Sequence, residues 1–192
     1  MSRIPQLDAT ALTSDQQEVY DAIVHGPRGA VVGPLRVWLQ SPGLASKAQA
    51  LGQHARYDSA LPTHLSELAI LVTARYWSSG FEWSHHVPIA LEAGEPKQAV
   101  YVIGQAKRFN FEDARMQAVF NFVVELHLLK KVSDAAYAAA KHLLGLRGCV
   151  DLVGICGYYT LISMTINVFD VADGSGPTLP KLEVGIGNYF KI

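Results

Sequence analysis

The sequence predicts one all-helical domain spanning residues 1–192, a bundle of about eight helices. Nearly every long segment spaces its apolar residues with the period of a helix, whereas the alternation typical of strands is scarce. A chain of 192 residues also has the length of a single domain with a substantial core. No low-complexity stretch or internal repeat suggests another architecture.

Helix starts are marked by the residues that usually occupy them. Hydroxyl side chains that can cap a helix precede four apolar segments, at Ser14, Ser41, Thr63 and Ser133. Ser14 has capping-box spacing with Gln17, and prolines suited to the first helical position stand at Pro42 and Pro96. The helices expected, in chain order, cover residues 14–25, 42–57, 63–77, 81–94, 96–107, 112–131, 134–145 and 148–170.

Two segments stand apart from the amphipathic helices. Residues 152–169 carry no charge and approach the length of a membrane span, but polar residues are scattered through them and no Lys or Arg flank supplies an orientation signal. We expect a helix buried in the core or at a subunit contact, and no membrane partner. The tail, residues 173–192, is rich in Gly and Pro and is expected to be an extended arm over the body or onto a neighbour.

Composition argues against several classes of function. Sixteen Lys and Arg residues oppose 17 Asp and Glu residues, and no basic run is interleaved with aromatic residues, so nucleic acid is not an expected partner. Cys149 and Cys156 fit neither a CxxC redox motif, nor a zinc site, nor a secreted disulfide framework. Since the N-terminus also lacks the apolar stretch of a signal peptide, we expect a cytoplasmic protein.

The strongest chemical signal is the stretch FEWSHHVPIALEAG, residues 81–94. Glu82 and His86 are four residues apart, so on a helix they share one face and lie within hydrogen-bonding reach. A carboxylate beside an imidazole fixes its tautomer and favours the imidazolium, which suits proton transfer. A purely structural interpretation stands beside this one, because Ser79 and Glu82 also have capping-box spacing.

The neighbours of this pair add two expectations. Pro88 removes an amide from the helix and frees the carbonyl of Ser84, which predicts a kink there. His85 lies about 100° around the helix from His86, so only one of the two faces Glu82 squarely. We expect no metal, because adjacent histidines converge poorly on one ion and no HExxH motif adds a ligand. No nucleophile elbow, P-loop or dinucleotide fingerprint occurs.

The run LPTHLSELAILVTARYWSSGFEWSHHVPIALEAG resembles the core of the carboxymuconolactone decarboxylase family, which is related to alkylhydroperoxidase D-like proteins. The family pattern Glu-Trp-x-x-His-x-x-x-Ala-x-x-x-Gly is met by Glu82, Trp83, His86, Ala90 and Gly94, and an upstream glutamate of the pattern matches Glu67. The likeness extends over most of the chain, through residues 33–57 and 165–177. It implies an alkylhydroperoxidase D-like helical domain that assembles as a homotrimer or hexamer.

The resemblance departs from the redox members of that superfamily at one motif. Those members carry CxxCxxxH at this helix start, and here Ser79 and Glu82 stand at the cysteine positions while His86 keeps the histidine place. Without a thiolate at the helix N-terminus, the disulfide route to peroxide reduction has no attacking sulfur. What remains resembles the decarboxylase branch, which acts without a cofactor on a small lactone carboxylate in aromatic catabolism.

On this resemblance, His86 is the expected proton donor, with Glu82 orienting it and Glu67 tuning it or holding water. Arg75, eight residues beyond Glu67, is expected either to attract an anionic substrate or to form an ordinary ion pair. Further side chains expected at the small-molecule substrate are Tyr76, Trp77, Trp83, His85 and Asn167.

Two other functions stay open on the sequence. A residual redox protein of the alkylhydroperoxidase D type would have to use Cys149 and Cys156, which are about two helical turns apart and too distant for a disulfide without rearrangement. A non-catalytic helical oligomer that binds a hydrophobic ligand would leave the Glu82/His86 pair closed to solvent, with no cavity beside it.

Overall fold

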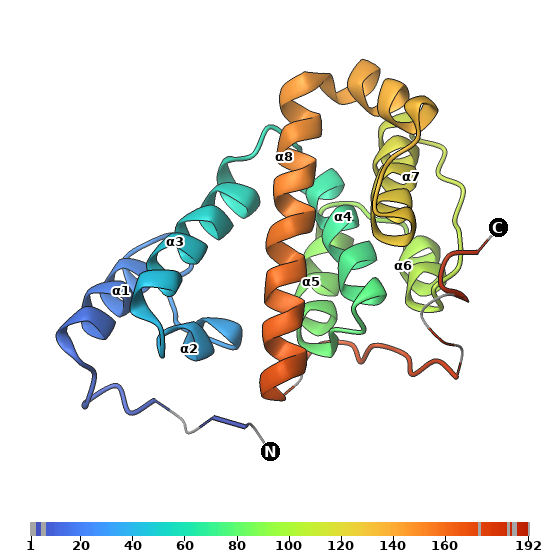
Figure 1. The fold of residues 1–192 in the computed structure, drawn as a ribbon. Helices are drawn as coiled ribbons and strands as arrows, with labels where there is room; N and C mark the ends of the chain where they lie inside the picture. Colours follow the sequence, from blue (N-terminus) through green and yellow to red (C-terminus); the bar gives the residue numbers. More distant parts are fainter. Residues whose placement is uncertain (1–2, 5–6, 173, 184, 186–187, 192) are drawn as a thin grey trace.

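The computed structural model describes residues 3–4, 7–172, 174–183, 185 and 188–191, and over these the chain is helical without strands (Figure 1). The elements in order are α1 (Ser14–Val24), α2 (Pro34–Trp38), α3 (Pro42–Gln53), the π-helical turn η1 (His54–Asp58), α4 (Thr63–Tyr76), α5 (Gly80–Glu92), α6 (Lys97–Gly104), α7 (Ala114–Leu129) and α8 (Asp134–Phe169). The predicted all-α bundle of about eight helices is confirmed.

The central helix of the bundle is α4. It packs against α5, α7 and α8, and every residue from Leu65 to Tyr76 is buried. Figure 1 shows α4 to α7 gathered on one side of α8, with α1 to α3 forming a separate layer on its other side. This N-terminal layer contacts α8 through α2, α3 and η1. The helices expected to carry the site, α4 and α5, therefore face α8 and the N-terminal layer.

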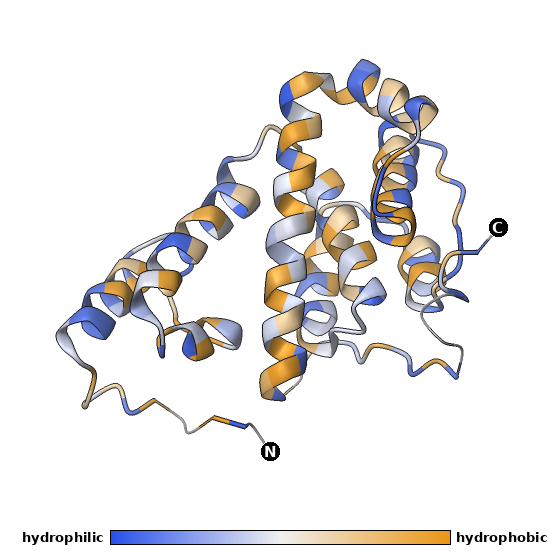
Figure 2. Cartoon of the chain, in the orientation of Figure 1, coloured by the Kyte–Doolittle hydropathy of each residue, from blue (hydrophilic) through white to orange (hydrophobic). Residues whose placement is uncertain are grey.

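The uncharged segment forms the second part of α8. The two helices expected over 134–145 and 148–170 form one element bent at Gly145, whose φ of 73° and ψ of 172° are not helical. Beyond Asp151 the helix is apolar or weakly polar nearly to its end (Figure 2). It is long and apolar enough to cross a membrane, yet half of its most apolar window is buried, as in the core helix of a soluble protein.

Two of the four predicted hydroxyl N-caps differ from the structure. Thr13, rather than Ser14, caps α1, and it forms the reciprocal capping box with Gln16. At α4 the N-cap position belongs to Pro62, and Thr63 is the first helical residue. Both shifts are of one residue, because several neighbouring residues can occupy a cap and the backbone conformation selects among them.

The described part of the C-terminal arm lies over the body of the same chain. The amide of Gly174 donates to the hydroxyl of Ser84 on α5 at 3.0 Å, and the amide of Phe190 donates to the carbonyl of Ala106 at 2.6 Å. A side chain at Gly176 would collide with the carbonyl of Ser84. The arm thus approaches α5 where Pro88 leaves that carbonyl without its helical donor.

Candidate active site

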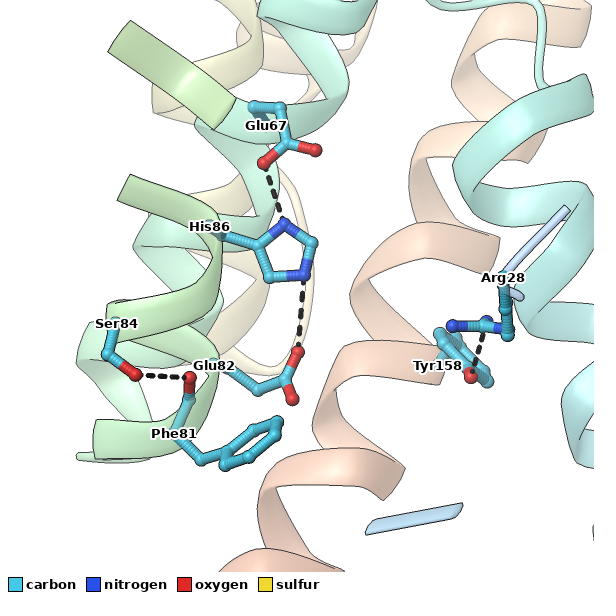
Figure 3. A network of polar contacts seen from close by, with 7 residues as sticks. All are labelled: Arg28, Glu67, Phe81, Glu82, Ser84, His86 and Tyr158. Carbon is cyan, nitrogen blue, oxygen red and sulfur yellow. Dashed lines mark hydrogen bonds and ion pairs between the residues drawn. The ribbon is translucent and has the colours of Figure 1, made fainter. Parts of the chain in front are cut away.

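His86 lies between two carboxylates that come from different helices. Its Nδ1 is 2.7 Å from Oε2 of Glu67 on α4, and its Nε2 is 3.4 Å from Oε2 of Glu82, one turn earlier on α5 (Figure 3). All three side chains are buried, each exposing 4% of its surface or less. The imidazole therefore joins the two helices inside the protein.

The two carboxylates keep His86 charged at neutral pH. Burial alone would lower the pKa of this imidazole, but the charge and hydrogen bond of Glu67, together with those of Glu82, outweigh burial and raise the pKa of His86 to about 9. The short contact to Glu67 is a charge-assisted hydrogen bond in which Nδ1–H donates. His86 is accordingly an imidazolium whose orientation is set by Glu67.

Glu82 pairs with the imidazole of His86 and does not form the capping box. Ser79 does occupy the N-cap position of α5, but its hydroxyl makes no capping bond and is buried without a partner. Burying an ionised carboxylate is unfavourable unless it is paired, and the imidazolium of His86 supplies that pairing. The expected roles of the glutamates also change: the shorter, orienting contact is to Glu67, whereas Glu82 lies on the Nε2 side.

A cavity of about 80 Å³ opens on the Glu82 side of His86. It lies between α5, α8 and the N-terminal layer, and Glu67 is not part of its wall. Its lining residues are Phe81, Glu82, His85 and His86 from α5, Tyr158, Tyr159 and Ile162 from α8, and Arg28, Ala30, Val32, Pro34, Leu35 and Arg56 from the N-terminal layer. His86 is thus placed where a small molecule can contact it.

Polar side chains beside His86 stay neutral. Tyr159 meets the His86 ring edge-on with the ring centroids 5.0 Å apart. The hydroxyl of Tyr158 accepts a hydrogen bond from Arg28 at 3.0 Å, and burial raises the pKa of Tyr158 to about 12. Burial, with the charges of His86 and Arg56, lowers the pKa of His85 to about 4, so this second histidine is uncharged.

Arg75 does not line this cavity; it lies at a separate hollow between α4 and the C-terminal arm, and its expected role in attracting substrate stays a prediction. Its guanidinium is buried and donates to the carbonyls of Gly104 and Pro180 and to the hydroxyls of Ser78 and Tyr189. These acceptors connect α4 to α6 and to the C-terminal arm. Arg75 is therefore committed to holding the arm, and it forms no ion pair with either active-site glutamate.

Four other expected substrate contacts also lie away from the cavity. Trp83 is buried and close to Gly104 of α6, because it points about 100° around α5 from Glu82. The indole of Trp77 donates to the hydroxyl of Thr160 at 3.1 Å. Asn167 donates to the carbonyl of Trp77 at 2.8 Å, and Tyr76 stacks on His127. These side chains pack the helices against one another, so of the five side chains expected at the substrate only His85 lines the cavity.

Two arginines and two tyrosines of the cavity wall were not predicted from the sequence: Arg28, Arg56, Tyr158 and Tyr159. Arg28 lies in the loop after α1 and Arg56 on η1, where the apolar period had predicted a plain helix to residue 57. No local motif links them to His86. The available signals were weak: the resemblance includes Arg56, and Tyr158-Tyr159 is an aromatic pair inside an uncharged helix.

The thiols and the metal-binding side chains offer no second centre in the described part of the chain. Cys149 and Cys156 are free and buried. Burial raises the pKa of the Cys149 thiol and raises that of Cys156 to about 12, so both are protonated and unreactive at neutral pH. Among the described residues, no group of three or more His, Cys, Asp or Glu side chains is placed to hold a metal ion.

Comparisons with known proteins agree with this architecture. A peroxidase-related protein from Silicibacter sp. TM1040 superposes with a TM-score of 0.70 at 13% identity, over 91% of this chain and 92% of that chain. An alanine-for-cysteine variant of the debrominase Bmp8, in complex with 2,3,4-tribromopyrrole, superposes with a TM-score of 0.71 at 12% identity, over 91% of this chain and 95% of that chain. At such identities the likeness shows the fold alone.

Sequence comparison matches one part of the chain to a known family. No curated protein is significantly similar to the chain. Residues 42–125, which run from α3 into α7 and include Glu67, Glu82 and His86, match the model of the carboxymuconolactone decarboxylase family. Residues 42–125, a little less than half of the chain, are thus similar to the carboxymuconolactone decarboxylase family, and the chain shares its all-α fold with the two solved structures.

Proposed function

We propose that the protein is a cofactor-independent lyase that decarboxylates a small lactone or carboxylic acid, with His86 as the proton donor. The observation that carries this proposal is a buried imidazolium, held between Glu67 and Glu82, at the wall of a cavity. The similarity of residues 42–125 to the carboxymuconolactone decarboxylase family supports the reaction class without naming the substrate.

Decarboxylation of a lactone acid requires a group that accepts an electron pair and a group that donates a proton. When the bond to the departing carboxylate breaks, carbon dioxide leaves and the electron pair moves to the lactone carbonyl, forming an enolate. His86 then protonates carbon, becomes neutral, and regains a proton from water. Glu67 binds Nδ1 tightly at 2.7 Å, away from the cavity, whereas Nε2 has the longer 3.4 Å contact with Glu82 on the cavity side, so Nε2 is the nitrogen that delivers the proton. Tyr158, which accepts from Arg28, keeps its own hydroxyl proton to donate to the enolate oxygen.

The alternative functions lack a supporting observation. A peroxidase of the disulfide type needs a thiolate near His86, and both thiols lie on α8 with raised pKa values and outside the cavity wall. A purely structural Glu82/His86 pair would be closed off, and a cavity stands beside this one. We therefore retain the lyase as the proposed function.

We also propose that copies of the chain assemble as a homotrimer or hexamer through α8, in a cytoplasmic location. Large apolar side chains recur on the outer side of this helix at successive spacings of 4, 3, 11 and 4 residues, which keep them on one face, and each exposes between 43% and 62% of its surface: Leu146, Val150, Val153, Met164 and Val168. Such a row is unusual on a monomer surface. Light scattering of the wild type and of Val150→Glu tests the assembly; a monomeric wild type contradicts it.

Carbon dioxide release from 4-carboxymuconolactone and from simpler lactone acids tests the lyase proposal. His86→Gln is expected to lower the rate by about 100-fold or more, the contribution typical of a positioned general acid. The matched control is His142→Gln, an exposed histidine of α8 that contacts none of the site residues. A folded His86→Gln protein with unchanged rate contradicts the mechanism, and a wild type that releases no carbon dioxide from any of these acids contradicts the function.

A further inference from the structure

The side of the cavity that faces His86 carries two cations that take no part in the proton transfer. Figure 3 shows Arg28 and Tyr158 across the site from His86 and its two carboxylates. Arg56, on η1, lines the same cavity, and its charge reaches His85. Within the described part of the chain, the ion pairs lie elsewhere, and neither arginine has a carboxylate within 4.0 Å.

Arg28 is held in place by packing, without a counterion. Its Nη2 donates to the hydroxyl of Tyr158 at 3.0 Å, and its Nε is buried with no hydrogen-bond partner. Gly52 of α3 lies directly against both side chains, and a side chain there would collide with the Tyr158 phenol and with Nη2. A buried donor without a hydrogen-bond partner is unfavourable. A ligand that supplies an acceptor would therefore replace the hydrogen bond that Nε of Arg28 lost to burial.

The charges around the cavity leave an excess of positive charge. Arg28, Arg56 and the His86 imidazolium oppose Glu82 at the wall and Glu67 behind it, while His85 is neutral. Three cations thus face two carboxylates, and both carboxylates are already bonded to His86. An entering anion meets two guanidinium groups that have no other anionic partner.

The size of the cavity limits the ligand. Its volume of about 80 Å³ has room for on the order of five to eight water-sized groups, at roughly 10–15 Å³ each. Phe81, Leu35 and Ile162 provide apolar surface between the two charged sides. A compact molecule with an apolar ring or short chain and an acidic end fits this arrangement of apolar residues between two charged sides.

We propose that Arg28 and Arg56 form an anion-binding site for an acidic group that the reaction keeps. A departing carboxylate loses its charge as it becomes carbon dioxide, so a guanidinium bound to it would stabilise the substrate more than the transition state. Binding a retained carboxylate instead stabilises both equally and positions the molecule with its reacting carbon toward His86. This inference rests on the proposed function in two respects: it takes the same cavity as the substrate site, and its distinction between a departing and a retained acidic group assumes decarboxylation.

Calorimetric binding of an unreactive matched pair tests the anion site. The probes are 5-oxotetrahydrofuran-2-carboxylate and its primary amide, which have the same ring and differ in charge. The acid is expected to bind at least about tenfold more tightly than the amide, and Arg56→Gln to lower the affinity for the acid about tenfold while leaving the amide unchanged. Arg28→Gln is expected to act likewise, and Arg56→Lys to retain part of the affinity.

The control is Arg147→Gln, an exposed arginine of α8 whose nearest carboxylate, Asp151, is 3.8 Å away. Thermal melts of each variant verify folding, and Arg56→Gln is the safer variant because Arg56 forms no hydrogen bond or ion pair among the described residues and lies over the ring of its neighbour Tyr57. Equal binding of acid and amide, or acid binding unchanged in both folded glutamine variants, overturns the anion site.

The two proposals fail separately. Acid binding that depends on Arg28 and Arg56, in a protein that releases no carbon dioxide, upholds the anion site and refutes the lyase. Carbon dioxide release with a KM unaffected by both arginine substitutions refutes the anion site and upholds the lyase.

Discussion

The two sides of the cavity are built differently. The side with His86 comes from the consecutive helices α4 and α5, and its three ionisable groups are buried and bonded to one another. The side with Arg28 and Arg56 comes from a loop and a π-helical turn of the N-terminal layer, and its two cations are partly exposed and lack a carboxylate partner. An internally neutralised group keeps its protonation state, whereas an unpaired cation is available to an anion.

This contrast leads to different expectations for the same kind of substitution. Changes on the His86 side should alter kcat and its pH dependence, because they change the charge state of the proton donor. Changes on the arginine side should alter KM and binding, because they remove an interaction made equally before and during the reaction. Four predictions test this division, in order of decreasing expected effect.

The largest effect is expected from removing the charge of Glu67. Glu67→Gln should lower kcat about tenfold or more and move the alkaline limb of the pH profile to lower pH, because the pKa of His86 falls when this carboxylate is neutralised. Glu82→Gln, with its longer contact, should shift the limb less. Glu92→Gln on the exposed side of α5 is the control. A pH profile identical to that of the wild type would remove Glu67 from the mechanism.

The next effect concerns the arginine side. Arg56→Gln should raise KM for a lactone acid about tenfold with kcat nearly unchanged, since one charged interaction of roughly 1.4 kcal/mol is lost equally from substrate and transition state. Steady-state kinetics at low and high salt measure the two KM values. The difference in KM between the variant and the wild type should become smaller at high salt. A drop in kcat with constant KM would place Arg56 on the proton-transfer side instead.

A third prediction concerns stability as pH rises. Folding raises the pKa of His86 to about 9, and burial together with Glu67 raises the pKa of Glu95 to about 8; both oxygens of Glu95 are buried without a hydrogen-bond partner. A raised pKa means that the protonated form is favoured in the folded state. The stabilisation from His86 is complete below about pH 6.5 and is lost as pH rises through about 9.

Thermal melts measure that prediction. The wild type should lose several degrees of Tm between pH 6.5 and 9, and Glu95→Gln should lose fewer, because the Glu95 contribution falls over pH 4.5 to 8 and the amide does not ionise. Glu92→Gln should follow the wild type. A Tm that is flat over this range, or the same slope in Glu95→Gln, would contradict the assignment.

The smallest effect is expected at Gly52. Gly52→Ala should displace the Tyr158 phenol and the Arg28 guanidinium, destabilising the protein by about 1–3 kcal/mol and weakening acid binding. Gly43→Ala is the matched control on the same helix, because no atom lies within 4 Å of the added carbon, and it should be neutral or slightly stabilising. Chemical unfolding of both variants makes the comparison. Equal stabilities would show that the arginine side tolerates rearrangement.

Local patterns were enough to predict the helical class and part of the site. Helical periodicity, caps and prolines place most elements within a few residues, and the spacing of Glu82 and His86 puts them on one face because helix geometry is local. The role of Glu67 came only from the family resemblance. Its contact with His86 spans 19 residues, and spacing on a single helix says nothing about pairs that far apart.

Other features required the folded chain. Glu82 fits a capping box and an imidazole pair equally well by spacing, and burial decides between them by leaving the imidazolium as its partner. By spacing along α4, Arg75 could lie near Glu67 and attract an anionic substrate. In the folded chain its guanidinium instead donates to acceptors in the C-terminal arm. The regular period of residues 42–57 likewise concealed the π-helical turn that presents Arg56.

By itself, the sequence determined the all-helical class, the absence of a CxxC motif and the histidine with its neighbouring glutamate, because each depends on residue identity or on contacts within one helix. Only the tertiary structure decided which carboxylate orients His86, where the cavity opens and which cations face it. The physical reason is that these depend on the packing of α4, α5 and α8 against the N-terminal layer, where burial and long-range contacts set the charge of each group.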